Sequence, residues 1–432
     1  MLRRALLAAG ILWMRPLSLG AQPVAPASTR LAGEWIFEMA GDAQPQRVRL
    51  EVAGDSLRGK VYGTAFTAAL SGRRLSFSVG DFRWRATVRG DSLIGWLGVG
   101  TDSSSWRAAR TVTPSSARRL VVNPSSFPRA FSTQHEPVAR LYAGDTVQTS
   151  TLDAAGWGPG AFGDRANKRA MGGNPLIGPF VIEGTVPGDV LVVRLHRVRF
   201  NRDWAFSGTS LMDSAIEPSY AVDRKPVMAG NKWILDTIAN TARLRDPSPA
   251  LRDYQVPLRP FLGVVATAPG GEWVPSSRES GDFGGNLENE RLREGATIML
   301  PVTASGSYLY IGDGHAAQGD GELTGDAMET SLDVTFSVDV IRWGFQTMAR
   351  AEDDELLMSL GVGGSTDQAL RRATSDMARW LEQRYDVTST DVALLMGFSL
   401  SYAVPDVVPP GFGVTARMPK RALATLRRRS AR

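Results

Sequence analysis

The chain has 432 residues, of which 43% are hydrophobic and 22% are charged, a composition typical of a soluble globular protein with room for two folding units. Cysteine is absent, which excludes disulfides, zinc–thiolate sites and cysteine nucleophiles. The formal net charge of +5 arises at the two ends of the chain, so the body lacks the basic face that nucleic-acid binding requires.

Residues 1–21 have the pattern of a secretory signal peptide. A cationic start and an apolar run from Ala5 to Met14 precede small residues near Ala21. The run is too short to span a bilayer, so no stable membrane insertion is expected after the signal is removed. We expect a periplasmic or secreted protein with a linker at 22–30. A translation start at Met14 is the alternative, and it would leave no signal.

Residues 31–110 are predicted to form a small antiparallel β module. Apolar residues alternate along 48–52, 75–79 and 84–88, as in half-buried strands. The tetrapeptide Gly-Asp-Ser-Leu occurs at Gly54 and again at Gly90, each time after such a strand, which predicts hairpin turns. The module resembles the lipocalin-like meanders appended to some exported bacterial enzymes. No chemistry is assigned to it.

A Ser/Pro-rich linker at 111–129 leads to a second unit, 130–423, which is followed by a basic tail at 424–432. Strand patterns dominate this unit, at 189–195, 297–300, 308–311 and 333–338. The fold class is therefore mainly β with a few helices, or α+β.

Two helices are predicted near the end of the second unit. The first follows Ser365, which has Gln368 at the spacing of a capping box. Its inward stripe is expected to contain Leu370, Ala373, Met377, Trp380 and Leu381. The second follows Thr388, with Val392, Leu395 and Phe398 expected to point inward.

The segment from Gly312 to Glu322 is predicted to be a loop between two strands, and it has the highest density of reactive side chains. If it is extended, Gln318, Asp320 and Glu322 point to the same side. Carboxylates that converge with the imidazole of His315 on a small space are unfavourable unless a cation or a substrate proton compensates their charge. Mixed nitrogen and oxygen ligands suit Zn²⁺, whereas oxygen ligands alone suit Ca²⁺ or Mg²⁺. A glycine-rich turn with solvated charges is the alternative.

Several blocks of the second unit resemble the acetamidase/formamidase family, in family order over about residues 130–422. They are Ala143–Val147 with Leu152–Ala154, Gly173–Pro175, Gly178–Gly184, Pro187–Asp189, Pro257–Val264, Ala268–Pro269, Gly281–Leu287 and Gly312–Glu329. The resemblance implies a β-rich amidohydrolase fold that forms homo-oligomers. It also implies a small amide substrate, such as formamide or acetamide, which is cleaved to the acid and ammonia.

The chain departs from the family pattern at two histidines. The positions where the family often carries them are occupied here by Phe127–Phe131 and Gly173–Pro175, and neither His135 nor His196 fills a gap. The metal and the small-amide specificity are therefore open. Zn²⁺ is the expected cofactor, with Ca²⁺ as the alternative.

Attack by water is the expected chemistry, because no cysteine is present and the matching blocks contain no lysine. Metal ligands or water-orienting groups are predicted at Asp153, His315 and Asp320, and the general base at Glu322. Asn286 and Gln318 are predicted to hold the amide, and Glu183 to support the ligands or protonate the leaving group. The alternatives are an exported hydrolase of a larger amide and a small-ligand-binding protein without turnover.

Overall fold

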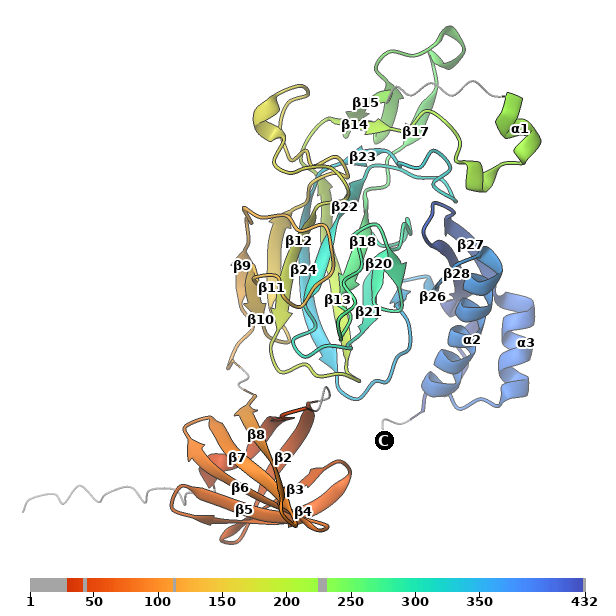
Figure 1. Cartoon of the computed structure of the whole chain (residues 1–432). Helices are drawn as coiled ribbons and strands as arrows, with labels where there is room; N and C mark the ends of the chain where they lie inside the picture. The colour runs from red at the N-terminus through yellow and green to blue at the C-terminus, as the bar shows by residue number, and fades with distance from the viewer. Residues whose placement is uncertain (1–28, 42–44, 112–113, 224–230, 430–432) are drawn as a thin grey trace, which may run out of the picture. The chain divides into compact units, whose positions relative to one another are not determined.

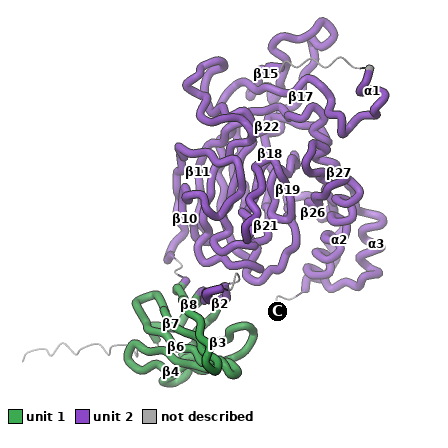
Figure 2. The backbone as a smooth tube through the Cα atoms, in the orientation of Figure 1, with its two compact units in different colours: residues 1–35, 48–110 green, residues 36–47, 111–432 purple. Residues whose placement is uncertain are grey.

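A computed structural model describes residues 29–41, 45–111, 114–223 and 231–429 (Figure 1). The predicted signal peptide, most of the 22–30 linker and the last three residues of the basic tail lie outside the described residues, so export stays a prediction. By their internal contacts the described residues form two compact units, one containing 29–35 and 48–110 and the other the remainder (Figure 2).

The N-terminal part forms a closed eight-stranded barrel in the order β1 to β8. Its interior contains a cluster of aromatic rings: Phe66 stacks on Phe77 with centroids 4.1 Å apart, and Trp84 meets Trp106 edge to face at 5.2 Å. Gly54 and Gly90 adopt positive φ in the predicted hairpin turns. The strands are Gly33–Met39, Gln46–Ala53, Ser56–Val61, Thr64–Ser71, Arg74–Val79, Phe82–Arg89, Ser92–Val99 and Asp102–Arg110. The predicted antiparallel β module is confirmed; its lipocalin-like character stays a prediction.

The second unit contains two large sheets. The 11-stranded sheet has the order β17-β16-β15-β14-β23-β22-β18-β20-β19, with β12 pairing β22 and β10 pairing β12. Its strands are β10 (Ala139–Leu141), β12 (Leu176–Ile182), β14 (Trp204–Ser207), β15 (Asn231–Asp236), β16 (Thr241–Leu244), β17 (Gln255–Pro257), β18 (Phe261–Thr267), β19 (Ser280–Gly281), β20 (Gly284–Asn286), β22 (Leu309–His315) and β23 (Glu329–Thr330).

The 9-stranded sheet has the order β27-β28-β26-β25-β21-β13-β24-β11-β9. Its strands are β9 (Arg119–Val121), β11 (Thr146–Ser150), β13 (Val190–Phe200), β21 (Thr297–Pro301), β24 (Leu332–Ile341), β25 (Arg350–Glu352), β26 (Leu356–Gly363), β27 (Ser401–Asp406) and β28 (Phe412–Pro419). The main hydrophobic core takes side chains from both sheets, for example Phe180 and Ile311 from one and Leu191 and Phe336 from the other. The mainly β fold class is confirmed.

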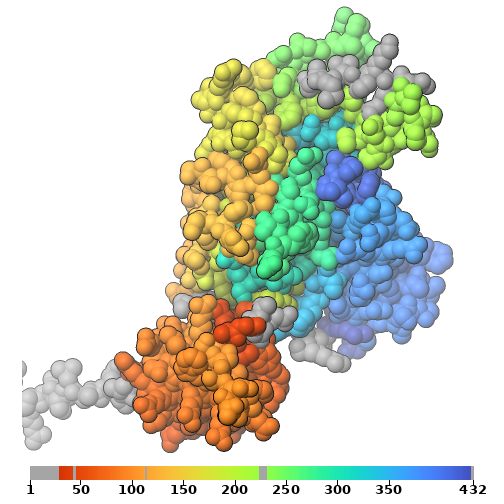
Figure 3. Space-filling model, viewed as in Figure 1, coloured from red at the N-terminus to blue at the C-terminus, as the bar shows by residue number. Residues whose placement is uncertain are grey.

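The helices are α1 (Pro218–Asp223), α2 (Thr366–Arg384) and α3 (Ser389–Ser399). Helices α2 and α3 form the surface on one side of the second unit (Figure 3). Ser365 caps α2 by accepting from the Gln368 N–H, but the Gln368 side chain accepts from Gly364 instead of closing a capping box. Among the described residues, no helix has the length and apolarity to cross a membrane.

The predicted inward faces of these helices need two corrections. Leu370 is 39% exposed and Phe398 is 88% exposed, so the prediction that both point inward is wrong. Leu395 and Met396 pack against the core below α3, and Phe398 follows Met396 by about 200° of helical rotation. Because α3 is apolar over most of its sequence, periodicity alone does not identify its inward side.

The loop predicted between Gly312 and Glu322 also needs correction. Its first four residues are the end of strand β22, and the loop begins only after His315. The following segment is not extended, and Glu322 has a φ of 48°. The alternation expected for Gln318, Asp320 and Glu322 is therefore absent.

Candidate functional site

The site begins with His315 at the end of β22, in the middle of the larger sheet. In this sheet His315 lies opposite Phe261 of β18 on one side and Glu329 of β23 on the other. The His315 ring is fully buried, and its Nε2 lies 3.0 Å from Glu329 Oε1. Strand pairing therefore places an imidazole beside a buried carboxylate.

Three more buried carboxylates surround this ring. His315 Nδ1 lies 3.3 Å from Glu288 Oε2, and His315 Nε2 lies 3.5 Å from Asp313 Oδ1. Glu322 also offers an oxygen within 4.8 Å of the His315 and Glu288 ligand atoms. Glu288, Asp313 and Glu322 have φ angles of 50°, 55° and 48°. Such left-handed backbone is costly for residues other than glycine and concentrates at functional sites.

Without a bound cation, the crowded and buried carboxylates of the site are unfavourable in their charged form. Burial raises the pKa of Glu288 and of Glu322 well above the ordinary carboxyl value, and it raises the pKa of Glu329 to about 8. Burial alone would lower the pKa of His315, but the charges of Glu329, Glu288 and Asp313 outweigh it and raise that pKa. The cluster therefore retains protons unless another positive charge replaces them.

The donor atoms fit a divalent cation. Two overlapping groups have ligand atoms within 4.8 Å of one another: Glu288, His315 and Glu322, and Asp313, His315 and Glu329. Among the described residues, Glu288 Oε2, Asp313 Oδ1 and His315 Nε2 are buried without a hydrogen-bond partner. Buried polar atoms without partners are rare and point to an ion or ordered water. One nitrogen among several oxygen ligands is compatible with Zn²⁺.

Chelation should destabilise the protein more as the pH rises. In the metal-free protein Glu329 and His315 hold protons more tightly in the folded than in the unfolded state, so their contribution to stability is lost as pH rises through the folded pKa values. We expect a chelator to lower the Tm more at pH 9 than at pH 6, as measured by thermal melts with and without added metal. An equal loss at both pH values would contradict this.

Asn286 and Gln318, the two residues predicted to hold the amide, lie at the cluster, and hydrogen bonds fix the orientation of each side chain. Asn174 Nδ2 donates to Asn286 Oδ1 at 3.0 Å and to Asp313 Oδ2 at 2.9 Å, which leaves the Asn286 amide nitrogen to turn toward a ligand. Gln318 Oε1 lies 3.0 Å from His315 Nδ1, and Gln318 Nε2 donates to two main-chain oxygens. Gln318 thus orients the imidazole.

The structure does not place Asp153, Asp320 or Glu183 in the cluster. Asp153 is fully buried, but its Oδ2 accepts from Arg202 at 2.7 Å and its Oδ1 accepts from the Trp157 N–H. Asp320 is exposed in the loop after β22. Glu183 is partly exposed and pairs with Arg140 at 2.8 Å.

Sequence reasoning missed four polar residues of the cluster, Asn174, Glu288, Asp313 and Glu329. All four lie inside or beside the blocks that carried the family resemblance, and Asp313 is two residues before His315. These residues could not be grouped from the sequence, because the order of strands β23, β22, β18 and β20 exists only in the folded sheet. An acidic residue next to a glycine-rich family block was the available clue.

A cavity of about 380 Å³ opens onto these groups. Its lining includes Asn286, Glu288, Asp313, Glu322 and Glu329. A small polar molecule in this cavity would touch the carboxylates directly, beside the free side of the Asn286 amide.

The backbone of Gly263 in β18 packs closely against the cluster. A Cβ there would lie 3.0 Å from Glu288 Oε2, 3.0 Å from His315 Cε1 and 3.1 Å from Asp313 Oδ2. We expect Gly263→Ala to displace these groups and lower metal affinity by roughly 10- to 100-fold, the usual cost of disturbing the support of a metal ligand. Calorimetric titration of metal-free protein measures this. Gly397→Ala, where a Cβ meets nothing within 4 Å, is the matched control, and equal affinities in both variants would contradict the prediction.

Comparisons with known proteins agree with this geometry. Residues 274–359, which run from before β19 to within β26, match the model of the Acetamidase/Formamidase family. The resemblance to the acetamidase/formamidase family is confirmed. The matched segment contains Glu288, Asp313, His315, Glu322 and Glu329, so the family signature and the buried cluster coincide.

Three solved structures share the acetamidase/formamidase fold of the second unit. An acetamidase from Yersinia enterocolitica has 24% identity and a TM-score of 0.62, covering 73% of this chain and 96% of that one. A predicted acetamidase/formamidase from Thermoanaerobacter tengcongensis has 22% identity and a TM-score of 0.61, covering 72% and 98%. An acetamidase from Bacillus halodurans has 22% identity and a TM-score of 0.60, covering 71% and 99%.

A curated relative carries a related name. The Schizosaccharomyces pombe protein named "Putative formamidase" is 26% identical over an alignment of 221 residues, and the match covers 40% of this chain. The chain spans about half the length of this curated relative, since the match covers 53% of it.

Proposed function

We propose that the protein hydrolyses the carbon–nitrogen bond of a short aliphatic amide, such as formamide or acetamide, to a carboxylic acid and ammonia. The observation that carries this proposal is the buried cluster of His315 and four carboxylates, of which the carboxylates line a small cavity. The cluster lies within the segment that matches the family. Its buried, titratable groups favour catalysis over ligand binding alone, because perturbed pKa values concentrate at reactive sites.

A divalent cation fits between the carboxylates and His315. Asp313, His315 and Glu329 would hold it and leave Glu322 free to accept a proton. A cation bound there supplies positive charge that polarises the amide carbonyl and makes water easier to deprotonate. Zn²⁺ stays the expected ion, and homo-oligomerisation and export stay predictions of the sequence and of the resemblance.

Glu322 is the proposed general base. Its carboxylate lines the cavity, and burial raises its pKa above the ordinary carboxyl value, which makes the ionised carboxylate a stronger proton acceptor. It takes a proton from the attacking water as the water oxygen bonds to the carbonyl carbon. That proton is then delivered to the amide nitrogen, the carbon–nitrogen bond breaks, and ammonia leaves.

Asn286 and Gln318 have different proposed roles. The Asn286 amide nitrogen donates to the carbonyl oxygen, where negative charge develops in the transition state. Gln318 acts through His315, because its own amide hydrogens are already donated to Glu288 O and Pro405 O. Asn174 holds both Asn286 and Asp313 in place and belongs to the same positioning set.

Ammonia release from formamide, acetamide and propionamide tests the proposed function. We expect turnover by metal-loaded protein and its loss on chelation. Hydrolysis of none of these amides, with a folded and metal-loaded protein, would contradict the proposal.

A further inference from the structure

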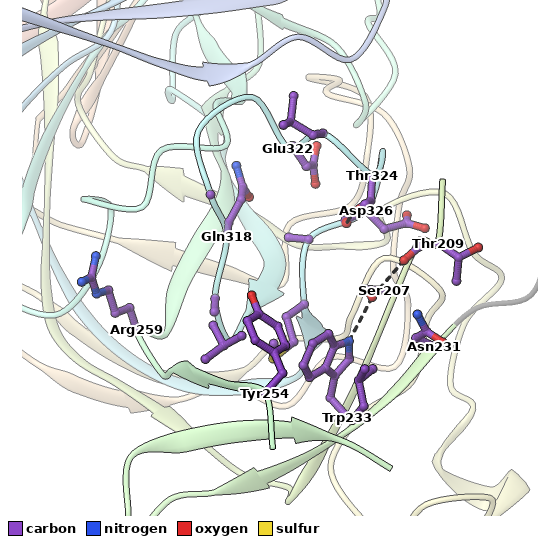
Figure 4. Close-up of a pocket in the computed structure, with 18 of the residues that line it drawn as sticks. Ser207, Thr209, Asn231, Trp233, Tyr254, Arg259, Gln318, Glu322, Thr324 and Asp326 are labelled. Atoms are coloured by element: carbon purple, nitrogen blue, oxygen red, sulfur yellow. Dashed lines mark hydrogen bonds between the residues drawn. The ribbon is translucent and has the colours of Figure 1, made fainter. Parts of the chain in front are cut away.

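A second, larger cavity adjoins the acidic site. Its volume is about 590 Å³, and it shares Glu322 and Asp326 with the smaller cavity. Strands β14 to β17 and the segment after them form one wall, and residues 317–328 form the other (Figure 4). Because Glu322 lines both cavities, a group held in the larger one lies next to the proposed base.

The wall opposite Glu322 is aromatic and fixed in place (Figure 4). Trp233 Nε1 donates to Ser207 Oγ at 2.9 Å, which holds the indole. The Tyr254 ring stands next to it, with centroids 6.4 Å apart and planes at 61°. The lining also includes apolar side chains such as Leu244, Val256 and Met328. Apolar walls with a few polar groups are typical of sites for organic ligands.

The charges around this cavity restrict what it can hold. Arg259 at its wall is already paired with Glu290 at 3.2 Å. The acidic side chains in the lining, Glu322 and Asp326, would repel a carboxylate. These acidic groups exclude an acidic substituent, and the wall formed by Trp233 and Tyr254 suits an apolar one.

The size of the cavity exceeds what a short amide needs. Acetamide has four heavy atoms and fills roughly the volume of three or four water molecules, about 100 Å³ at about 30 Å³ each. The smaller cavity alone accommodates that volume. The additional 590 Å³ has room for a six-membered ring and its linker.

We propose that this cavity is an acyl subsite for neutral primary amides that carry a ring or a branched apolar acyl group. The proposal rests on the proposed function, which supplies the reaction at Glu322. The amide group lies at the acidic site and the acyl group packs against Trp233 and Tyr254. Water adds to the carbonyl carbon, and the products are ammonia and the bulky carboxylic acid.

Steady-state hydrolysis of acetamide and phenylacetamide by the full-length, metal-loaded protein tests the subsite. We expect kcat/KM for phenylacetamide to exceed that for acetamide by about 10-fold or more, because each buried methylene contributes about 10- to 200-fold in discrimination. Gly319→Leu adds bulk at the cavity wall, where a Cβ meets nothing within 4 Å. This substitution should lower kcat/KM for phenylacetamide about 10-fold and leave kcat/KM for acetamide within about 2-fold of the wild-type value.

Two further variants complete the experiment. Trp233→Ala removes the aromatic wall and should also reduce selectivity for phenylacetamide. Gly397→Leu places the same substitution on α3, where a Cβ also meets nothing within 4 Å, and should behave like wild type. Selectivity that is unchanged in both Gly319→Leu and Trp233→Ala would overturn the subsite.

The outcomes separate the subsite from the proposed function. Hydrolysis of acetamide with no preference for phenylacetamide overturns the subsite and leaves the proposed function intact. Faster cleavage of N-benzylacetamide than of phenylacetamide would place the bulky group on the nitrogen side and overturn the acyl assignment. Hydrolysis of no amide overturns both.

Discussion

Replacing Glu322 by Gln should lower the turnover of acetamide by about 10²-fold or more, the usual scale for loss of a general base. Glutamine keeps the size of the side chain and so keeps the left-handed backbone at this position without new steric conflict. It removes the ability to accept a proton from water. Ammonia release at saturating amide measures the effect, and a thermal melt checks that the variant is folded.

Glu183→Gln is the matched control, because the sequence predicted a catalytic role for both glutamates. Glu183 is partly exposed and pairs with Arg140, outside the lining of the cavity. The Glu183→Gln variant should therefore turn over acetamide at a rate within about 2-fold of the wild-type rate, since an exposed ion pair contributes little. Turnover near the wild-type rate in Glu322→Gln, or an equal loss in both variants, would contradict the assignment of Glu322 as the base.

Replacing Asp153 by Ala should destabilise the fold by about 3–5 kcal/mol, the cost of removing one partner of a buried ion pair. Asp153 and Arg202 are both fully buried in their side chains, 2.7 Å apart. Without the carboxylate, the guanidinium of Arg202 stays buried and uncompensated. Urea denaturation of metal-free protein measures the loss, and metal titration shows whether Asp153 also affects binding.

The geometry explains how Asp153 affects the cluster without belonging to it. Arg202 Nη2 also donates to the main-chain oxygen of Glu329, and the N–H of Ala154 lies 3.3 Å from Glu329 Oε2. Asp153 thus supports Glu329 through Arg202 and the adjacent backbone. Asp320→Ala is the control, because exposed substitutions usually change stability by less than about 0.5 kcal/mol. Equal losses in Asp153→Ala and Asp320→Ala would refute this interpretation.

The strands were largely predictable because their signal is local. Alternating or continuous apolar residues mark the longer strands, as in β5 and β24, and Gly54 and Gly90 mark hairpins by the backbone freedom they provide. The inward sides of the late helices were less predictable. Phe398 is exposed although it is as apolar as its neighbours, because α3 packs on only one side.

The site was predictable only in part, because its members come together through strand order. His315 and Glu322 were found from one dense segment, and both lie at the cluster. Glu288 and Glu329 required knowledge that β18 and β23 flank β22 and that β20 lies beyond β18. Asp153 was selected as an acid in a family block, but its partner Arg202 stands 49 positions away and becomes adjacent only on folding. Periodicity carries no information about such pairs.

Ammonia release from acetamide during titration of metal-free protein with Zn²⁺ tests the central claim most directly. We expect no turnover at the start, a rise with added metal and saturation near one equivalent per chain, because the two ligand groups share His315. Full turnover by protein from which all metal has been removed, or binding of Zn²⁺ without any gain in ammonia release, would contradict the proposed centre.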